Sequence, residues 1–206
     1  TPLYSSAASD VYKRQFVHSP LADGDCIGCH NPHTSNFDML MAAPADTICY
    51  TCHDSVVPED AKSVHQVVID GQCTLCHDPH ASENEFNLLK KGSELCYECH
   101  QEMADKVEKN KYTHPPVRED CLGCHNAHSS DKNNSLLTDN SPTLCLQCHE
   151  TDKETFKSLH REYPVQKADC TSCHDPHGSS TAAMLYDNVH EPVAKRNCEQ
   201  LSLIHI

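Results

Sequence analysis

The sequence predicts a mostly irregular fold with short α-helices and little or no β-structure, built as an array of repeats. Two observations predict it: apolar side chains are few, and cysteines recur at regular spacings along the chain. Only 37 of the 206 residues are Leu, Ile, Val or Phe, there is no Trp, and the formal net charge is -14. So little apolar side chain cannot offset the entropy lost when a backbone of this length is ordered. Something other than side chains must therefore supply the core.

Fourteen of the fifteen cysteines fall into seven C-x-x-C-H motifs, and a histidine follows the second cysteine every time. The cysteine pairs are Cys26 and Cys29, Cys49 and Cys52, Cys73 and Cys76, Cys96 and Cys99, Cys121 and Cys124, Cys145 and Cys148, and Cys170 and Cys173. The histidines are His30, His53, His77, His100, His125, His149 and His174. This is the spacing of c-type haem attachment. On one helical turn these three positions share a face, so both thiols can bond the porphyrin while the imidazole binds the iron.

Three other kinds of site contain C-x-x-C pairs, but none of them uses the histidine. Zinc ribbons need four ligands, disulfide frameworks pair the cysteines with each other, and thioredoxin-like motifs occur singly. The sequence therefore predicts haem c, with seven haems in this chain and the porphyrins forming the core. Cys198 begins an eighth motif, in which Leu201 and Ser202 stand where cysteine and histidine are due. We therefore expect at least eight haems in the full-length protein.

The motifs alternate between two types, which indicates a repeated two-haem module of about 48 residues. Odd-numbered motifs carry a second histidine three residues after the first, and even-numbered motifs lack it. These trailing histidines are His33, His80, His128 and His177. A leading histidine also precedes each odd motif by seven to ten residues: His18, His65, His114 and His160. Two haems need two further ligands, so we predict that these eight histidines are the distal ligands rather than surface or core residues.

Spacing suggests which distal histidine serves which haem. A trailing histidine lies too close to its own motif to reach the opposite face of that haem, so it must serve a neighbour. A leading histidine has enough chain to fold over the haem that it precedes. We therefore predict that His65 serves the haem of Cys73 and Cys76, and that His80 serves the haem of Cys96 and Cys99.

With these motifs, the chain resembles the multihaem c-type cytochromes with doubled C-x-x-C-H repeats. Its ligand layout is similar to that of the small low-potential tetrahaem cytochromes, and the resemblance covers residues 18 to about 198. The third module departs slightly, because Ala127 stands where the others have proline. The resemblance implies closely spaced haems with histidine on both faces, and electron transfer across the periplasm or out to the cell surface.

The repeats divide the chain into modules. We expect a non-native or unstructured flank at 1–15, two-haem modules at 16–64, 65–113 and 114–159, an incomplete module at 160–200 and a non-native tail at 201–206. Capping signals at Asp46, Ser93 and Ser141 place helix starts near the even motifs. The helix candidates are 94–110 and 142–160; residues 129–143 read as a loop, and 67–69 could form at most a short β-bridge.

The predicted function is electron transfer along a chain of low-potential haems, not catalysis, as a periplasmic carrier or an extracellular conduit. Histidine on both faces gives a lower potential than His/Met ligation and leaves no iron position for a substrate. The alternatives are a multihaem reductase with one open haem and a subunit of a conducting filament. Expected partners are cytochromes, quinol dehydrogenases or terminal reductases, steered partly by the acidic surface. We expect no nucleic-acid binding, and no apolar run reaches the roughly 18 to 20 residues of a membrane span.

Overall fold

The structure is a computed structural model that describes residues 14–195 and residue 197. The chain forms two compact units. One contains the chain up to Glu98 together with Asn126–Leu136, and the other contains Cys99–His125 and the chain from Leu137 onward. The loop that follows the third odd motif thus lies in the first unit, while the motif itself lies in the second. Of the expected flank at 1–15, only the last two residues are among the described residues. The expected tail at 201–206 lies wholly outside them.

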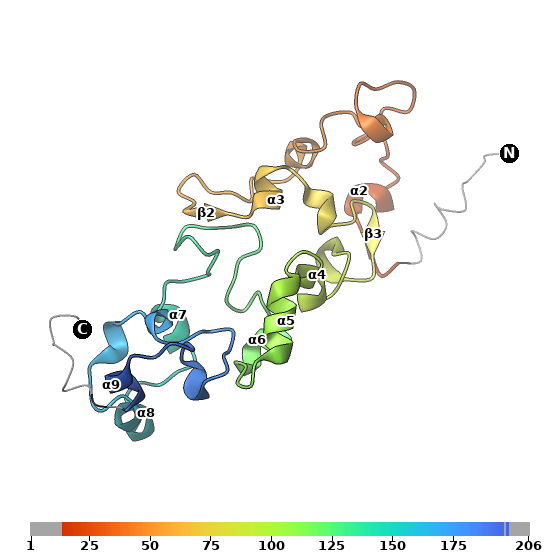
Figure 1. Cartoon of the computed structure of the whole chain (residues 1–206). Helices are drawn as coiled ribbons and strands as arrows, with labels where there is room; N and C mark the ends of the chain where they lie inside the picture. The colour runs from red at the N-terminus through yellow and green to blue at the C-terminus, as the bar shows by residue number, and fades with distance from the viewer. Residues whose placement is uncertain (1–13, 196, 198–206) are drawn as a thin grey trace. The chain divides into compact units, whose positions relative to one another are not determined.

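The described residues are mostly irregular, with short helices and very short strands, as the sequence predicted (Figure 1). The α-helices are α2 Ser19–Ala22, α3 Gln66–Ile69, α4 Ser93–Tyr97, α5 Gln101–Lys109, α6 Pro115–Glu119, α7 Thr143–Leu146, α8 Glu154–Leu159 and α9 Glu191–Ala194. The 3-10 helices are η1 Asp38–Leu40, η2 Ile48–Thr51, η3 Cys73–Leu75, η4 Glu85–Asn87, η5 Val165–Lys167, η6 Cys170–Ser172 and η7 Ala182–Met184. The strands are β1 Phe16–Val17, β2 Ser63–Val64, β3 Ala81–Ser82 and β4 Ser129–Ser130.

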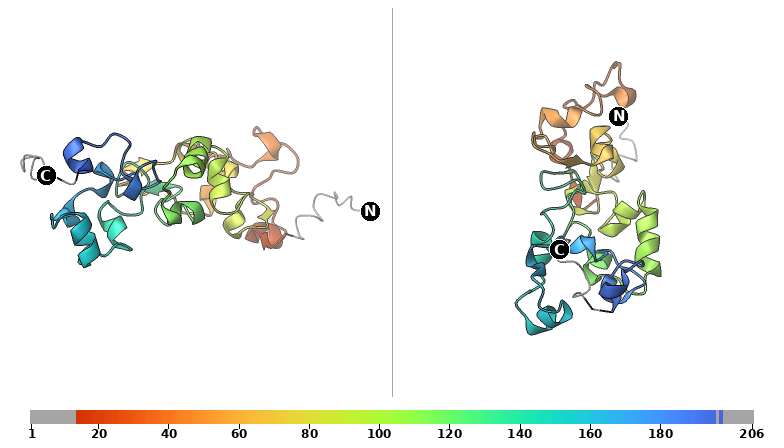
Figure 2. Two further views of the ribbon diagram at one scale, coloured as in Figure 1. Left: turned by 60° about the horizontal axis from the view of Figure 1, so that its bottom comes forward. Right: turned by 60° about the vertical axis from the view of Figure 1, so that its left-hand side comes forward.

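The two longest predicted helices are each divided at a haem-attachment motif. The candidate 94–110 becomes α4 and α5, and α5 begins directly after its N-cap residue, His100. The candidate 142–160 becomes α7 and α8, with the motif histidine His149 between them. Figure 2 shows the short helices of the chain from two further directions. The continuous helix is therefore interrupted at the motif, where the two cysteines and the histidine have to lie on the same side of the chain.

Three of the four leading histidines begin short helices. His18, His65 and His114 are the N-cap residues of α2, α3 and α6, each with an extended backbone before the helix starts, and His190 is the N-cap residue of α9. Proline stands in the first turn of α2, α6 and α9, where its missing amide proton costs nothing. The expected β-bridge at residues 67–69 is wrong, because these residues belong to α3.

Short antiparallel ladders connect segments that are far apart in the sequence. β1 pairs with β3, with Phe16 opposite Ser82, and β2 pairs with β4, with Ser63 opposite Ser130. Tyr112 forms an isolated bridge with Ser179 that repeats the arrangement. In each of these cases the segment just before a leading histidine pairs with the segment just after the trailing histidine of the next module. The modules therefore interlock.

Few of the described side chains are buried. The buried apolar residues are Ile48, Ala81 and Val107, while Met39 and Phe86 are 85% and 80% exposed. Ser82, Ser129, Ser130 and Ser179 are buried instead, at the ladders. Within the part of the chain that the structure describes, apolar side chains thus form no continuous core.

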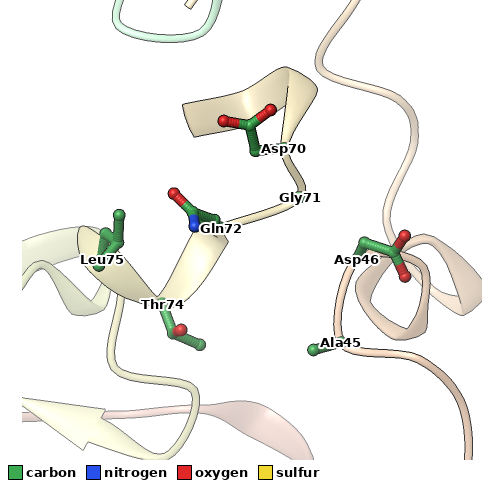
Figure 3. Close-up of a pocket in the computed structure, with 7 residues that line it drawn as sticks. All are labelled: Ala45, Asp46, Asp70, Gly71, Gln72, Thr74 and Leu75. Carbon is green, nitrogen blue, oxygen red and sulfur yellow. The ribbon is translucent and has the colours of Figure 1, made fainter. Parts of the chain in front are cut away.

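Gly71 marks a close approach between the segments that lead into two successive motifs. Figure 3 shows its turn opposite Asp46, which lies shortly before Cys49. Gly71 has a φ of +66°, and a Cβ atom at this position would lie 2.1 Å from the Cβ of Asp46. This approach requires glycine both for its left-handed backbone and for the space.

We predict that Gly71→Ala destabilises the haem-loaded protein more than Gly24→Ala does. Gly24 has a similar φ of +74°, but a Cβ added there would have nothing within 4 Å, so its substitution costs only the left-handed backbone, about 1–2 kcal/mol. Gly71→Ala adds a clash that must separate two motifs, and overpacking of this kind costs about 1–3 kcal/mol. Guanidinium denaturation followed by haem absorbance measures the difference. Equal losses for the two variants would contradict the close approach.

Candidate cofactor sites

The haem-attachment motifs close single helical turns. In six of the motifs the amide of the motif histidine donates to the carbonyl of the first cysteine at 2.9 or 3.0 Å. The six histidines are His30, His53, His77, His125, His149 and His174. Residues three and four apart on such a turn lie on the same side. The motifs therefore have the local geometry that attachment of a porphyrin through both thiols requires.

Histidine rings lie in facing pairs. In each described pair a motif histidine faces a leading or a trailing histidine, with ring centres 6.0 to 6.2 Å apart. The pairs are His53 with His18, His30 with His80, His77 with His128, His149 with His114, His125 with His177 and His174 with His160. Five pairs have ring planes within 12 to 23° of parallel, and the pair of His160 and His174 has planes at 62°.

These separations fit a metal ion between the rings. An imidazole nitrogen binds a first-row metal at about 2 Å and the ring centre lies about 1 Å behind it, so two imidazoles on opposite faces of one iron have centres about 6 Å apart. Rings in direct contact lie closer, as Phe156 and His160 do at 4.2 Å. The residues present therefore fit a haem iron with histidine on both faces.

Hydrogen bonds orient the motif imidazoles. The Nδ1 atoms of His30, His77 and His174 lie 2.8 to 3.0 Å from backbone carbonyl oxygens nine residues further on. These oxygens belong to Met39, Phe86 and Ala183. A carbonyl can only accept, so Nδ1 carries the proton and Nε2 is left to bind a metal. Histidine ligands of metals are commonly held in this way.

The three carbonyl groups come from strained turns. Met39, Phe86 and Ala183 have φ values of 54, 57 and 58°, a region that residues other than glycine rarely adopt. The turn is then closed by bridges from the motif histidines, such as His30 with Met41 and His77 with Leu88. Strain of this kind persists only where the surroundings fix it, which is common at functional sites.

Three of the four leading histidines are oriented by a backbone carbonyl of the next module. His18 Nδ1 bonds the carbonyl of Pro79 at 2.9 Å, and His65 Nδ1 bonds that of Ala127 at 3.1 Å. His114 has the corresponding bond to the carbonyl of Pro176. In each case the acceptor directly precedes a trailing histidine. One backbone segment thus orients a leading imidazole and presents a trailing one.

The pairing differs from the one that spacing suggested. His80 faces His30 of the preceding module, and not the next motif along the chain. Two leading histidines, His18 and His114, face the even motifs of their own modules, whereas His160 faces the odd motif that it precedes. The reason is the ladder: it fixes each trailing histidine beside the previous module, which chain separation alone does not reveal.

A short turn closed by an Asn or Asp side chain fixes the position of each trailing histidine. The turn residue is visible in the sequence, but the prediction of ligand pairs from residue spacing does not use it. An Asn or Asp follows every odd motif histidine, and its Oδ1 accepts the amide of the trailing histidine two residues later at 2.9 to 3.3 Å. These residues are Asn31, Asp78, Asn126 and Asp175. The even motifs have Asp54, Gln101 and Glu150 at this place and no trailing histidine. Alignment of the odd motifs therefore contains the signal for this turn.

Two of these turn residues are carboxylates held in the charged form. Partial burial raises the pKa of Asp78, but amide hydrogen bonds from His80 and Ala81 and the Arg14 guanidinium at 2.7 Å outweigh it, so the pKa lies below its usual value. Asp175 has a lowered pKa for similar reasons, with Lys106 as its ion-pair partner. Both carboxylates thus stay available as acceptors for the turn.

Burial favours neutral imidazoles. It is the largest cause of the lowered pKa of His114, His128 and His177, and the histidine that each one faces adds to the shift. Metal ligation requires neutral imidazole. These three rings are therefore already biased toward the state that binds iron.

Among the described residues the cysteines form no disulfide with one another, and some of them lie in contact across modules. Burial, followed by neighbouring thiols, raises the pKa of Cys49, Cys124 and Cys170. The side chains of Cys49 and Cys73 form a hydrogen bond with each other, and the side chains of Cys145 and Cys170 do the same. In both cases the first cysteine of an even motif contacts the first cysteine of the next odd motif.

Some predicted residues are not brought to a partner. His33 faces no other histidine ring within the described residues, unlike His80, His128 and His177. Cys198, where the eighth motif begins, lies outside them. In the ranges that the structure describes, no group of three or more His, Cys, Asp or Glu side chains is arranged around a metal position. No helix there is long and apolar enough to cross a membrane.

Comparison with known protein families gives a match over most of the chain. A family model described as "Doubled CXXCH motif" matches residues 18–58, 65–105, 114–154 and 163–189. The first three matched segments begin at a leading histidine, and the fourth begins after His160. No curated protein matches the chain.

We predict that Asp78→Ala lowers the stability of the haem-loaded protein, whereas Asp78→Asn retains most of it. Alanine leaves the amides of His80 and Ala81 without their acceptor, at about 1 kcal/mol each. Asparagine keeps the acceptor, as Asn31 and Asn126 do, and loses only the pair with Arg14, which contributes about 0–1 kcal/mol. Denaturation midpoints and the high-spin haem fraction provide the measurement. If Asp78→Asn fell as far as Asp78→Ala, the ion pair rather than the turn would hold His80.

Replacing His80 tests the pairing. We expect His80→Met to convert the haem of Cys26 and Cys29 to His/Met ligation and to raise its potential. Redox titration detects the change, and NMR contacts between the new methionine methyl group and haem protons locate it. Contacts to the haem of Cys96 and Cys99 would restore the pairing that spacing suggested.

Proposed function

The chain belongs to the doubled CXXCH family of multihaem c-type cytochromes, and from this premise we propose that it carries electrons along a row of low-potential haems, each held between two histidines. The six ring pairs with an iron-sized separation carry this proposal. When bound, the haem iron supplies one-electron chemistry by cycling between its ferric and ferrous states. Every other part of the proposal concerns what the residues of this chain do.

The residues divide into three roles. The fourteen motif cysteines anchor seven haems c by thioethers, and the seven motif histidines bind the irons on the proximal side. The leading and trailing histidines bind the distal side, oriented by the carbonyl groups and turns described above. We assign His33 the same distal role, because it occupies the place of the other trailing histidines.

Contacts between motifs support a row of haems within each unit. Thioether sulfurs lie at the edge of a porphyrin, so the meeting of Cys49 with Cys73 and of Cys145 with Cys170 would bring the edges of successive haems together. Cys124 also lies close enough to Cys145 and Cys148 for their charges to interact, which connects an odd motif with the even motif of its module. This arrangement would let electrons pass from haem to haem without leaving the protein.

Ligation on both faces supports a carrier rather than an enzyme. Neutral histidine on each side saturates the iron and favours a low potential. A substrate would need an open iron position, which the paired rings do not provide. The role of a multihaem reductase is therefore the less favoured one.

The surface and the chemistry of attachment support an exported redox protein. c-type cytochromes are generally extracytoplasmic, and we place this chain in the periplasm or at the cell surface. Its net charge of -14 favours redox partners with a basic contact surface, such as other cytochromes, quinol dehydrogenases or terminal reductases.

Carbon monoxide tests the saturation of the irons. We expect the dithionite-reduced native protein to bind far less than one equivalent of carbon monoxide, because histidine occupies both faces of the haems. The same sample at a denaturing pH, where the distal histidines leave, is the positive control. Stoichiometric binding to one haem of the native protein would instead support a reductase with an open site.

A further inference from the structure

The pair of His160 and His174 differs from the other five pairs in its geometry. Their ring centres are 6.2 Å apart, which still fits one iron, but the ring planes are crossed at 62°. The other five pairs have planes within 12 to 23° of parallel. Among the described pairs, the haem of Cys170 and Cys173 would therefore have crossed axial ligands.

Local structure explains the difference. His18, His65 and His114 each precede a helix as its N-cap, whereas His160 follows α8 as its C-cap. Its Nδ1 bonds the carbonyl of Phe156, in its own helix, at 2.9 Å, and its ring packs on the Phe156 ring. The other leading histidines instead bond carbonyl groups of the next module. His160 is thus oriented from within α8.

The chain after His160 turns back sharply. Arg161 and Glu162 have φ values of 55 and 60°, two successive left-handed residues without glycine. This conformation is costly for such side chains and indicates that the turn is held by its surroundings. It returns the chain toward η6, where the motif of Cys170 begins. The family match also begins only at residue 163 here, so His160 lies outside the standard repeat.

We propose that His160 is the distal ligand of the haem of Cys170 and Cys173, and that α8 holds its ring in the crossed orientation. The other odd motif histidines that pair, His30, His77 and His125, take their partners from the next module's trailing histidines. His174 takes its partner from fourteen residues upstream. This inference rests on the proposed bis-histidine ligation and adds that one haem differs from the others in ligand source and ligand orientation.

The ligand orientation has a spectroscopic consequence. Parallel imidazole planes split the two iron dπ orbitals that interact with the rings, and the ferric haem gives a rhombic EPR spectrum. Crossed planes leave these orbitals close in energy, and the spectrum shows one feature at a large g value. We therefore expect the oxidised protein to give a large-g signal equivalent to one haem, together with rhombic low-spin signals.

Variants assign the large-g signal. In His160→Ala this signal should be lost, with one haem becoming high-spin, whereas the rhombic signals remain. In the matched control His114→Ala, a rhombic signal should be lost and the large-g signal retained. His160→Met keeps a ligand at this position, so it tests the assignment even if alanine impairs folding: the large-g signal should give way to one His/Met haem of raised potential.

Two results would overturn the proposal. One is a large-g signal that persists in both His160 variants, which would mean that another residue binds this iron. The other is a wild-type spectrum with only rhombic low-spin signals that neither His160 variant alters. A wild-type protein without any low-spin signals would instead contradict bis-histidine ligation itself, so failure of the underlying function is distinguishable.

Discussion

A short backbone ladder between successive modules is the interaction on which the ligand arrangement depends. The amide of His18 donates to the carbonyl of His80 at 2.8 Å, and the amide of His65 donates to that of His128 at 2.9 Å. With the neighbouring strand pairs, these bonds hold a leading histidine and the next module's trailing histidine in one fixed relation. Each then faces a different motif: His18 faces His53, while His80 faces His30. One ladder therefore positions two of the proposed distal ligands.

Ladders of two residues cannot stabilise a fold alone. Isolated two-stranded pairs are marginal in water even when they are longer, and the described side chains bury little apolar surface around them. Bound haem would close this gap in two ways: its large apolar macrocycle would be buried, and its iron would join a motif histidine and a proposed distal histidine from distant segments. Folding and haem loading are therefore expected to be one process. The exposed apolar side chains, such as Phe86, are those that would cover a porphyrin.

The sequence was sufficient for what depends on local chemistry. Cys-x-x-Cys-His within one turn, the alternation of two motif types and the second set of histidines all follow from residue spacing, and the family match and the irregular fold confirm the general picture. The direction of pairing could not be predicted, because His80 is selected for His30 by hydrogen bonds between segments more than sixty residues apart. Nor could the strained turns at Met39, Phe86 and Ala183 be predicted, because none of these three residue types favours a left-handed backbone. The divided helices show the same limit, since the propensity of 94–110 is overridden at the motif.

An experimental structure of the mature, haem-loaded protein tests the central claim most directly, namely that the haems of the first three odd motifs are completed by the next module. The account predicts that the Nε2 atoms of His30 and His80 bind opposite faces of one iron, and that His77 and His128 do the same. Nε2 of His80 bound to the iron of the haem at Cys96 and Cys99, or any distal ligand on the iron of His30 from within residues 16–64, would contradict it.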